Sequence, residues 1–270
     1  MLLDPNDFPT LSENHAKKLR ALKQKKLRDR DNLFLAEGVR LCEDALAGEA
    51  KVRDVIITNE ALRHARIAAL VQNIIDKKHP VHISSVRLFK TLSDEKSPQG
   101  ILFVVEKPVV PPIDTISGPL IVGLDDLQDP GNLGAILRSA EWFGVKEIVL
   151  SPGCVDPYNP KVVRSSMGAI FRIVLCTFIN LEEFLARFKE RGYRAVGSMV
   201  NASTNLPNVS ATGKDVLLIG NEANGLSPAL SSLIDLSVRI PGQGQGESLN
   251  AAMSASIFLY HFAQKVNPAA

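Results

Sequence analysis

The chain has 270 residues, of which 45% are hydrophobic, so it is long and apolar enough to form one large domain or two ordinary ones. Its net charge is only +2. Its three cysteines lie far apart and include no CxxC pair, so neither a disulfide framework nor a zinc site is indicated. With no apolar run of roughly 18 residues and no signal-peptide pattern, we expect a protein of a reducing cytoplasm, not of a membrane.

Positive charge is concentrated near the N-terminus. Residues 17–30 contain eight basic residues and one acid, Asp29, which gives a local net charge of +7. Ala16, Leu19 and Leu22 recur every three residues, which predicts an amphipathic helical arm over residues 1–30. Its basic face either is simply solvated or follows a phosphate backbone, and we expect the second. The expected contacts are Lys17, Lys18, Arg20, Lys23, Lys25, Lys26 and Arg28.

Residues 31–107 predict a small α/β domain. Strand-like runs lie at 33–35, 55–58, 81–84 and 101–105, and helical patterns lie between them at 39–47, 60–77 and 86–92. The proline-rich stretch that follows cannot continue a strand or a helix, so we expect a linker over residues 108–118.

Residues 119–270 predict a second, larger α/β domain. Strand-like runs at 120–124, 147–150, 171–175, 195–198, 216–219 and 238–240 are separated by helical patterns, among them 133–143, 181–191 and a final helix at 248–264. Strands that alternate with helices indicate a mostly parallel sheet.

Three polar junctions in this second domain carry its chemistry. They span residues 129–134, 219–227 and 240–250, and each follows a strand-like run and leads into helical sequence. In open α/β sheets such loops bind ligands at the carboxyl ends of strands. Glycine permits close backbone approach, and Asn or Ser supply directed hydrogen bonds. The junctions therefore predict one pocket for a polar small molecule, which indicates an enzyme.

Each junction also has a simpler interpretation. Gly131-Asn132-Leu133-Gly134 could be only the start of a helix that Asn132 caps, although Arg138 less than two turns beyond favours a ligand there. No dinucleotide fingerprint or Walker A loop occurs. Ser248 resembles a nucleophile elbow, but Asn250 replaces the required glycine and no acid follows, which argues against a hydrolase. Ser248 is either a helix cap or a group that orients a ligand.

We expect no metal site. Asp125 and Asp126 are adjacent, and adjacent side chains on an extended chain point to opposite faces. His79 and His82 would lie on opposite sides of a strand, with no further ligand nearby in the sequence.

Taken together, the junctions resemble the three motifs of the SpoU (TrmH-like) RNA ribose 2′-O-methyltransferases of the SPOUT superfamily. The first motif is Asn132-Leu133-Gly134 with Arg138. The second is Gly220-Asn221-Glu222 with residues 225–227, and the third is Ile240-Pro241 with residues 247–250. The match spans the second domain. The first domain is similar to the substrate-binding domain of many members at residues 34–38 and 97–100.

The resemblance implies an α/β fold of SPOUT type, whose parallel sheet ends in a C-terminal trefoil knot, plus a smaller N-terminal α/β substrate-binding domain that is L30e-like. It also implies a homodimer and the methyl donor S-adenosylmethionine. The residues implied to bind this cofactor are Gly220, Ile240, Leu249, Ser198 and Gly225, and those implied to be catalytic are Asn132, Arg138, Glu222, Ser248 and Asn250.

The function that the resemblance implies is methylation of a ribose 2′-hydroxyl, with ribosomal RNA as the first choice of substrate and transfer RNA as the second. Two alternatives stay open. One is a non-catalytic RNA-binding or ribosome-assembly protein with the same fold, and the other is a SPOUT enzyme that methylates a base.

Overall fold

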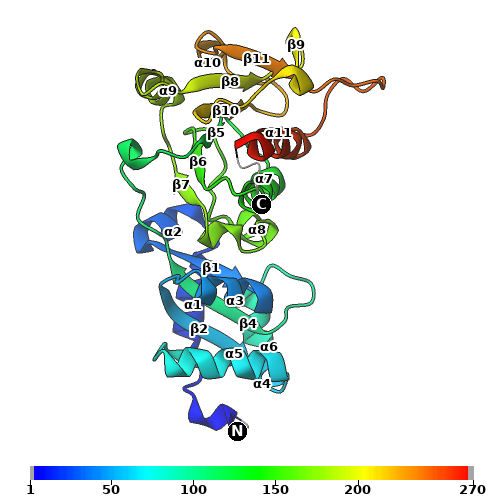
Figure 1. Ribbon diagram of the computed structural model, residues 1–270. Helices are drawn as coiled ribbons and strands as arrows, with labels where there is room; N and C mark the ends of the chain where they lie inside the picture. Colours follow the sequence, from blue (N-terminus) through cyan, green and yellow to red (C-terminus); the bar gives the residue numbers. More distant parts are fainter. Residues whose placement is uncertain (1–2, 267–270) are drawn as a thin grey trace. The chain divides into compact units, whose positions relative to one another are not determined.

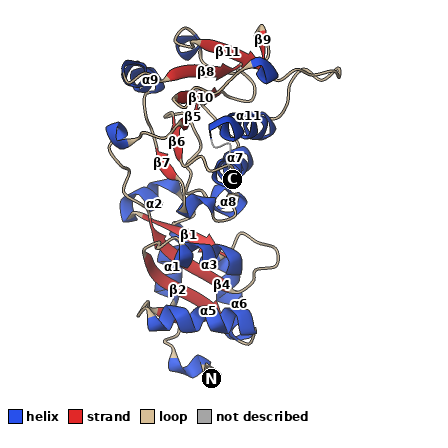
Figure 2. Ribbon diagram, in the orientation of Figure 1, coloured by secondary structure: helices blue, strands red, loops and turns tan. Residues whose placement is uncertain are grey.

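Two separate sheets organise the chain (Figures 1 and 2). The computed structural model describes residues 3–266. Unit 1 contains the residues up to Pro108 together with Asp156–Phe171, and unit 2 contains Val109–Val155 and the residues from Arg172 onward. The expected second domain, residues 119–270, therefore differs in one segment, because residues 156–171 pack with the N-terminal part of the chain.

Unit 1 is built on a four-stranded sheet with the order β1 (Leu33–Glu37), β4 (Ile101–Glu106), β2 (Val52–Thr58) and β3 (Val81–Ser84). Strands β2 and β3 are parallel, and the other pairs are antiparallel. The four expected strands are confirmed. Its helices include α3 (Val39–Ala47), α4 (Asn59–Leu62), α5 (Ala65–Asp76) and α6 (Val86–Leu92), so the single helix expected over 60–77 is divided in two.

The basic N-terminal segment is part of unit 1. After the short helix η1 (Pro5–Asp7), the expected helical arm consists of two helices, α1 (Glu13–Ala21) and α2 (Lys25–Asp31). Leu11, Ala16, Leu19 and Leu22 are buried in a cluster that includes Phe89 of α6 and residues of three strands. Burial of this apolar face fixes the segment on the sheet and leaves most of its basic side chains exposed.

Residues 156–171 include α8 (Pro160–Ser165) and η3 (Ala169–Phe171). The Tyr158 ring packs on Phe34 of β1, with ring centroids 4.9 Å apart. Asp156 accepts hydrogen bonds at Oδ2 from Arg28 Nε at 2.9 Å and Nη2 at 2.5 Å. Arg28 is only 2% exposed and Asp156 7%, so this is a buried ion pair between α2 and a segment 128 residues away.

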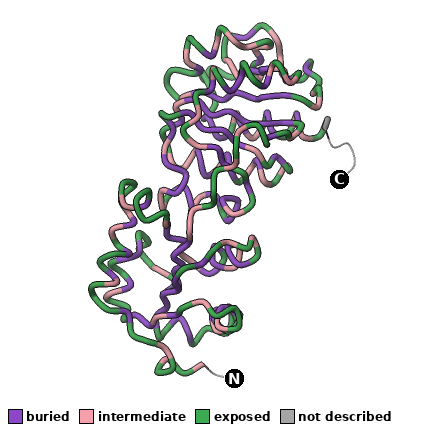
Figure 3. The backbone as a smooth tube through the Cα atoms, turned by 90° about the vertical axis from the view of Figure 1, so that its left-hand side faces the viewer, coloured by how far each residue is buried: buried purple, intermediate pink, exposed green. Residues whose placement is uncertain are grey.

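Unit 2 contains a seven-stranded sheet in which every pair is parallel, as predicted. Its order is β7 (Val174–Cys176), β6 (Glu147–Leu150), β5 (Leu120–Leu124), β10 (Asp215–Ile219), β8 (Arg194–Ser198), β11 (Leu236–Arg239) and β9 (Thr204–Asn205). Strands β5 and β10 are buried at every residue, as expected for a parallel sheet that is covered on both faces. Figure 3 colours the backbone by burial.

Helices cover both faces of this sheet. Phe184 and Phe188 of α9 (Leu181–Glu190) and Leu230 of α10 (Pro228–Ser231) belong to one core cluster with the strands. On the other side in Figure 1, α7 (Pro130–Trp142) and α11 (Ala251–Val266) pack together, and the Ser139 and Ser256 hydroxyls lie 2.7 Å apart. The short helices η2 (Ile113–Thr115) and η4 (Leu206–Asn208) lie in connections.

Within residues 3–266 no helix combines the length and the apolar composition that crossing a membrane requires.

Candidate active site

The three polar junctions lie at one edge of the unit 2 sheet. They follow β5, β10 and β11, which are parallel strands of the same sheet. Parallel strands place their carboxyl ends at the same edge, and in open α/β sheets that edge binds ligands. The loops after these strands are residues 125–129, 220–227 and 240–250.

In the first junction, the N-cap of α7 is Asp129, and Asn132 lies in the first turn of the helix. Asp129 Oδ1 accepts a hydrogen bond from the Asn132 backbone N at 2.8 Å, and Pro130 occupies the first turn. Asp at the cap and Pro in the first turn are favoured for helix starts. The expectation that Asn132 caps this helix was therefore wrong, because Asp129 already satisfies that backbone N–H. The Asn132 side chain is left to contact the other two junctions.

A chain of side-chain hydrogen bonds joins all three junctions. Asn132 Nδ2 donates to Glu222 Oε1 at 2.7 Å, and Asn250 Nδ2 donates to Asn132 Oδ1 at 2.9 Å. Because an amide nitrogen donates and an amide oxygen accepts, the Asn132 side chain must turn Nδ2 toward Glu222 and Oδ1 toward Asn250. The structure thus brings together three of the five residues predicted to be catalytic, and it fixes the orientation of Asn132.

The second junction is a tight turn. The backbones of Asn221 and Gly225 exchange two hydrogen bonds of 2.9 Å, and Asn221 Nδ2 donates to the Asp126 carbonyl at 2.8 Å. Gly225 has φ +68°, and a Cβ on Gly220 would lie 2.2 Å from the Gly225 carbonyl carbon. Both glycines are therefore required by the turn itself. This turn holds Glu222 opposite Asn132.

The third junction is an exposed loop that ends at α11. Asn250 Oδ1 accepts hydrogen bonds from the backbone N of Ala252 at 2.8 Å and of Met253 at 3.4 Å, so Asn250 caps the helix. The helix begins at Ala251, three residues later than predicted. Ser248 is therefore not the cap. Its side chain is exposed and lines the pocket described next.

A pocket of about 580 Å³ lies beside the third junction. Ser198, Ile240 and Leu249, which were predicted to bind the cofactor, line it together with Ser248. Gly220 and Gly225, predicted for the same role, are not among its lining residues. The remaining lining residues are Met199, Val200, Arg239, Pro241, Gly242, Gly244, Gly246, Glu247 and Ser254. Its volume falls within the ~300–1,000 Å³ typical of small-molecule sites.

Arg138 lies apart from the hydrogen-bonded residues. It follows Asn132 by six positions on α7, which turns it by about 120° around the helix axis. Its side chain is exposed, and it is not among the residues that line the pocket. Within one chain the structure therefore does not bring Arg138 to Asn132, Glu222 and Asn250. Asp126 and Asp129, which support the site, were not singled out as site residues from the sequence.

The predicted RNA contacts fall into three groups. Lys17, Lys18, Arg20, Lys25 and Lys26 are exposed. Lys23 is half-buried, and its Nζ donates to Asp94 Oδ1 at 2.7 Å and to the Ser93 carbonyl at 2.9 Å. Arg28 must be removed from the predicted contacts, because its guanidinium is buried and bonded to Asp156 and to two backbone carbonyls.

A second pocket, of about 300 Å³, lies in unit 1 where residues 34–38 and 97–100 meet. Gln99 Oε1 accepts from the Val39 backbone N at 2.8 Å, which joins the two stretches. Burial raises the pKa of the Glu37 carboxyl, although the Ser93 hydroxyl donates to it. Arg40 and Arg164 also line this pocket. Sequence reasoning missed both arginines, and Arg164 comes from the segment that was assigned to the other domain.

Comparisons with known proteins agree with this architecture. The sequence model of the SpoU rRNA Methylase family matches residues 119–260, and that of the MRM3-like substrate binding domain matches residues 13–102. The 23S rRNA (guanosine(2553)-2′-O)-methyltransferase RlmP of Bacillus subtilis is 30% identical over 240 residues, which is 89% of this chain and 92% of that protein.

Two solved structures are similar along nearly the whole chain. The AdoMet-bound rRNA methyltransferase from Sinorhizobium meliloti is 29% identical, with a TM-score of 0.83, and the match covers 95% of this chain and 96% of that one. The SpoU methyltransferase AviRb from Streptomyces viridochromogenes, in complex with AdoMet, is 27% identical, with a TM-score of 0.84 and coverage of 94% and 98%. With its three motifs joined at one sheet edge, the chain belongs to the SpoU rRNA methylase family and is an RNA methyltransferase.

Proposed function

We propose that this chain transfers a methyl group from S-adenosylmethionine to a ribose 2′-hydroxyl of ribosomal RNA. The observation that carries this proposal is the hydrogen-bond chain through Asn132, Glu222 and Asn250, next in sequence to the pocket-lining Ser248 and Leu249. The names of the relatives support the choice of substrate, since RlmP is a 23S rRNA 2′-O-methyltransferase.

The pocket in unit 2 fits the cofactor. Its lining combines apolar side chains with glycines and hydroxyl groups. A side chain on Gly242, Gly244 or Gly246 would meet no atom within 4 Å, so the loop backbone is open to a ligand. Ser198, Ile240 and Leu249 would hold the cofactor. When bound, S-adenosylmethionine supplies an activated methyl group on a sulfonium. The protein therefore has to align the 2′-hydroxyl with the methyl group and accommodate the loss of the hydroxyl proton.

The chain's own residues divide this work. Asn132, Glu222 and Asn250 fix the junctions in one arrangement, and Ser248 offers a hydroxyl that can hydrogen-bond the ribose. Arg138 stabilises negative charge on the reacting oxygen. An arginine side chain does not act as a base, because its guanidinium stays protonated in proteins. The proton consequently leaves by way of a phosphate or water.

A homodimer accounts for the position of Arg138. Met253, Ile257 and Tyr260 of α11 are 62%, 40% and 51% exposed, and their spacing places them on one helix face. Trp142, at the end of the neighbouring α7, is 82% exposed. A second copy of the chain covers this apolar face, so that Arg138 on α7 reaches the site of the partner subunit.

The proposal also includes a knotted C-terminal segment and a cytoplasmic site of action. The C-terminal segment forms a trefoil knot, a proposal supported by family membership and by the central position of β10 between β5 and β8. The three cysteines are free and buried, which is compatible with the cytoplasm as the site of action.

The test follows tritium from labelled S-adenosylmethionine into bacterial ribosomal RNA, transfer RNA and 30S or 50S particles, with nucleoside analysis after digestion. Wild-type protein should label 2′-O-methyl nucleosides of ribosomal RNA, and Arg138→Lys should incorporate about tenfold less, since lysine lacks the planar fork of the guanidinium. Label in transfer RNA or in a base would replace the proposed substrate. Cofactor binding with no label in any RNA would favour a non-catalytic RNA-binding protein.

The exposed basic residues of α1 and α2 should supply salt-dependent RNA affinity. Replacing Lys17, Lys18, Arg20 and Lys26 by glutamine should weaken RNA binding and lower the slope of log K against log salt by up to about 3–4. Binding titrations at several salt concentrations measure this. Replacing Lys51, Lys77, Lys78 and Lys90, which are exposed elsewhere in unit 1, is the control with equal charge loss. An unchanged slope in the first variant would contradict the assignment.

A further inference from the structure

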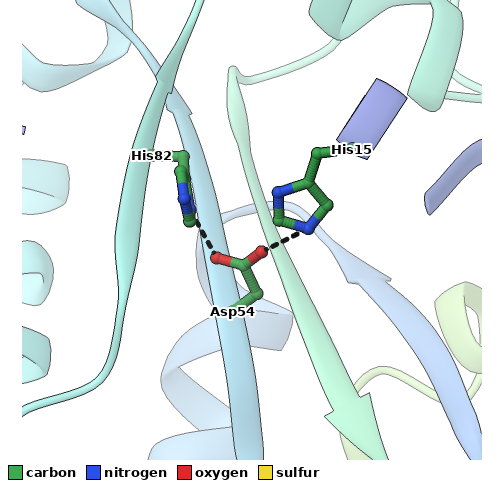
Figure 4. A group of neighbouring side chains, drawn as sticks. All are labelled: His15, Asp54 and His82. Atoms are coloured by element: carbon green, nitrogen blue, oxygen red, sulfur yellow. Dashed lines mark hydrogen bonds and ion pairs between the residues drawn. The ribbon is translucent and has the colours of Figure 1, made fainter. Parts of the chain in front are cut away.

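Two histidines and an aspartate meet in unit 1, outside both pockets. His15 lies on α1, Asp54 on β2 and His82 on β3 (Figure 4). Asp54 lies between the two rings, with Oδ2 2.9 Å from His15 Nε2 and Oδ1 2.8 Å from His82 Nδ1. The rings meet edge to face, with centroids 5.1 Å apart. Each imidazole nitrogen therefore faces one oxygen of the same carboxylate, and the three residues can each offer a ligand atom to one ion.

Local structure holds each of the three side chains in place. Asp54 follows an irregularity in the β2–β4 pairing, and such bulges re-aim side chains. Its Oδ1 also accepts a hydrogen bond from the Val55 backbone N at 2.9 Å. His15 sits in the first turn of α1, where its backbone N donates to Ser12 Oγ at 3.2 Å. The site is thus assembled from elements far apart in sequence.

The N-terminal segment is fixed on the same sheet. The Leu11 backbone N donates to the Ile83 carbonyl at 2.7 Å, and the Ile83 N donates to the Pro9 carbonyl at 2.9 Å. This pairing adds the segment to the edge of β3, next to His82. Because α1 begins two residues after Leu11, this pairing also places His15 next to Asp54.

The donor atoms suit a divalent transition metal. Two imidazole nitrogens and a carboxylate oxygen are preferred ligands of Zn²⁺, and catalytic zinc sites use three protein ligands plus water. In a tetrahedral site with bonds of ~2.0–2.2 Å, ligand atoms lie ~3.3–3.5 Å apart. Here one atom from each residue lies within 4.8 Å of the others, so small movements produce that geometry. The side chain of Asp54 is 9% exposed, whereas those of His15 and His82 are 34% and 22% exposed, which leaves a path for an ion.

We propose that His15, Asp54 and His82 bind one zinc-class divalent ion with a water at the fourth position. The ion links α1 to β2 and β3 and so stabilises the docking of the basic N-terminal segment. The site lies in unit 1 and has no part in methyl transfer. It revises the expectation of no metal, which considered His82 only with His79; the fold supplies His15 and Asp54 instead.

The test uses the full chain without an affinity tag, freed of metal with a chelator. Titration calorimetry should show one Zn²⁺ per chain, and Co²⁺ should give the visible absorption of a tetrahedral site. His15→Gln and His82→Gln should each weaken Zn²⁺ binding about tenfold or more. His64→Gln is the matched control, because His64 is exposed in the same unit and makes no side-chain cap bond. Mg²⁺, which prefers oxygen ligands, should not bind.

The three cysteine thiols are other side chains of the chain that could bind Zn²⁺ strongly. Burial raises the pKa of all three thiols, to about 11 for Cys176, so thiolates do not compete near neutral pH. Circular dichroism checks that each variant is folded, and if His82→Gln unfolds, the more exposed His15 decides the result. Absence of stoichiometric Zn²⁺ binding by wild-type protein, or unchanged affinity in His15→Gln, would overturn the proposal and leave a hydrogen-bonded cluster.

Discussion

Replacing Asp156 by alanine should lower the free energy of unfolding of unit 1 by about 3–5 kcal/mol, the range for removing one partner of a buried ion pair. The change leaves the Arg28 guanidinium buried without its carboxylate, because Arg28 is 2% exposed and cannot turn to water without repacking α2. Arg28 Nη1 would keep only the carbonyls of Leu22 and Lys23, at 2.8 Å each. Hydrogen exchange of the β1 and β4 amides in the full chain measures the loss within this unit.

Two further variants separate the buried charge from other effects. Asp94→Ala removes the partner of Lys23 at a pair whose side chains are 27% and 41% exposed, and it should cost less than about 1 kcal/mol. The double variant Arg28→Met with Asp156→Leu removes both charges and should recover much of the lost stability. If Asp156→Ala and Asp94→Ala destabilised the unit equally, burial of the ion pair would not be the cause.

The ion pair of Arg28 and Asp156 belongs to the part of the fold that the sequence could not predict. Periodicity located all four strands of unit 1, because their apolar runs are determined locally. It did not place residues 156–171 with the N-terminal unit, since the partner of Arg28 lies 128 residues away and no local pattern encodes that pairing. The helix α8 has only six residues and was not expected either.

Helix starts show a second limit. At α7 the sequence offers Asp129 and Asn132 as caps, and at α11 it offers Ser248 and Asn250. Asp, Asn and Ser are nearly equal as N-caps, so local preference cannot choose between positions two or three apart. The caps are Asp129 and Asn250. Asn132 was expected to cap α7 and does not, and of the two roles left open for Ser248, the structure leaves the one at the site.

The three junctions located the site from the sequence, but the roles of its individual residues were predictable only through the resemblance. Spacing placed polar residues at the ends of strands, but the contact between Asn132 and Glu222, 90 residues apart, follows from the arrangement of β5 beside β10. Arg138 was expected beside them and lies on another helix face. The cluster of His15, Asp54 and His82 was missed because its members come from three elements, and sequence separation hides such clusters.

Asn132→Ala should reduce kcat/KM for methyl transfer by about 100-fold or more, the cost of misplacing reacting groups by about 1 Å. Asn132 is the central member of the chain, since it donates to Glu222 Oε1 at 2.7 Å and accepts from Asn250 Nδ2 at 2.9 Å. Its removal disconnects all three junctions at once. The folded state should lose little stability, because Glu222 and Asn250 are exposed and can bond to water instead.

Asn132→Asp makes the test sharper, since it keeps the size of the side chain but places a carboxylate against the Glu222 carboxylate. Like charges at that distance repel, so activity should fall at least as far as in Asn132→Ala. Asn224→Ala is the control, because Asn224 is an exposed asparagine in the same turn as Glu222. Initial rates with RNA in excess, together with cofactor affinity measured separately, show whether alignment or binding is lost. Activity in Asn132→Ala within threefold of Asn224→Ala would show that the joined junctions do not align the reaction.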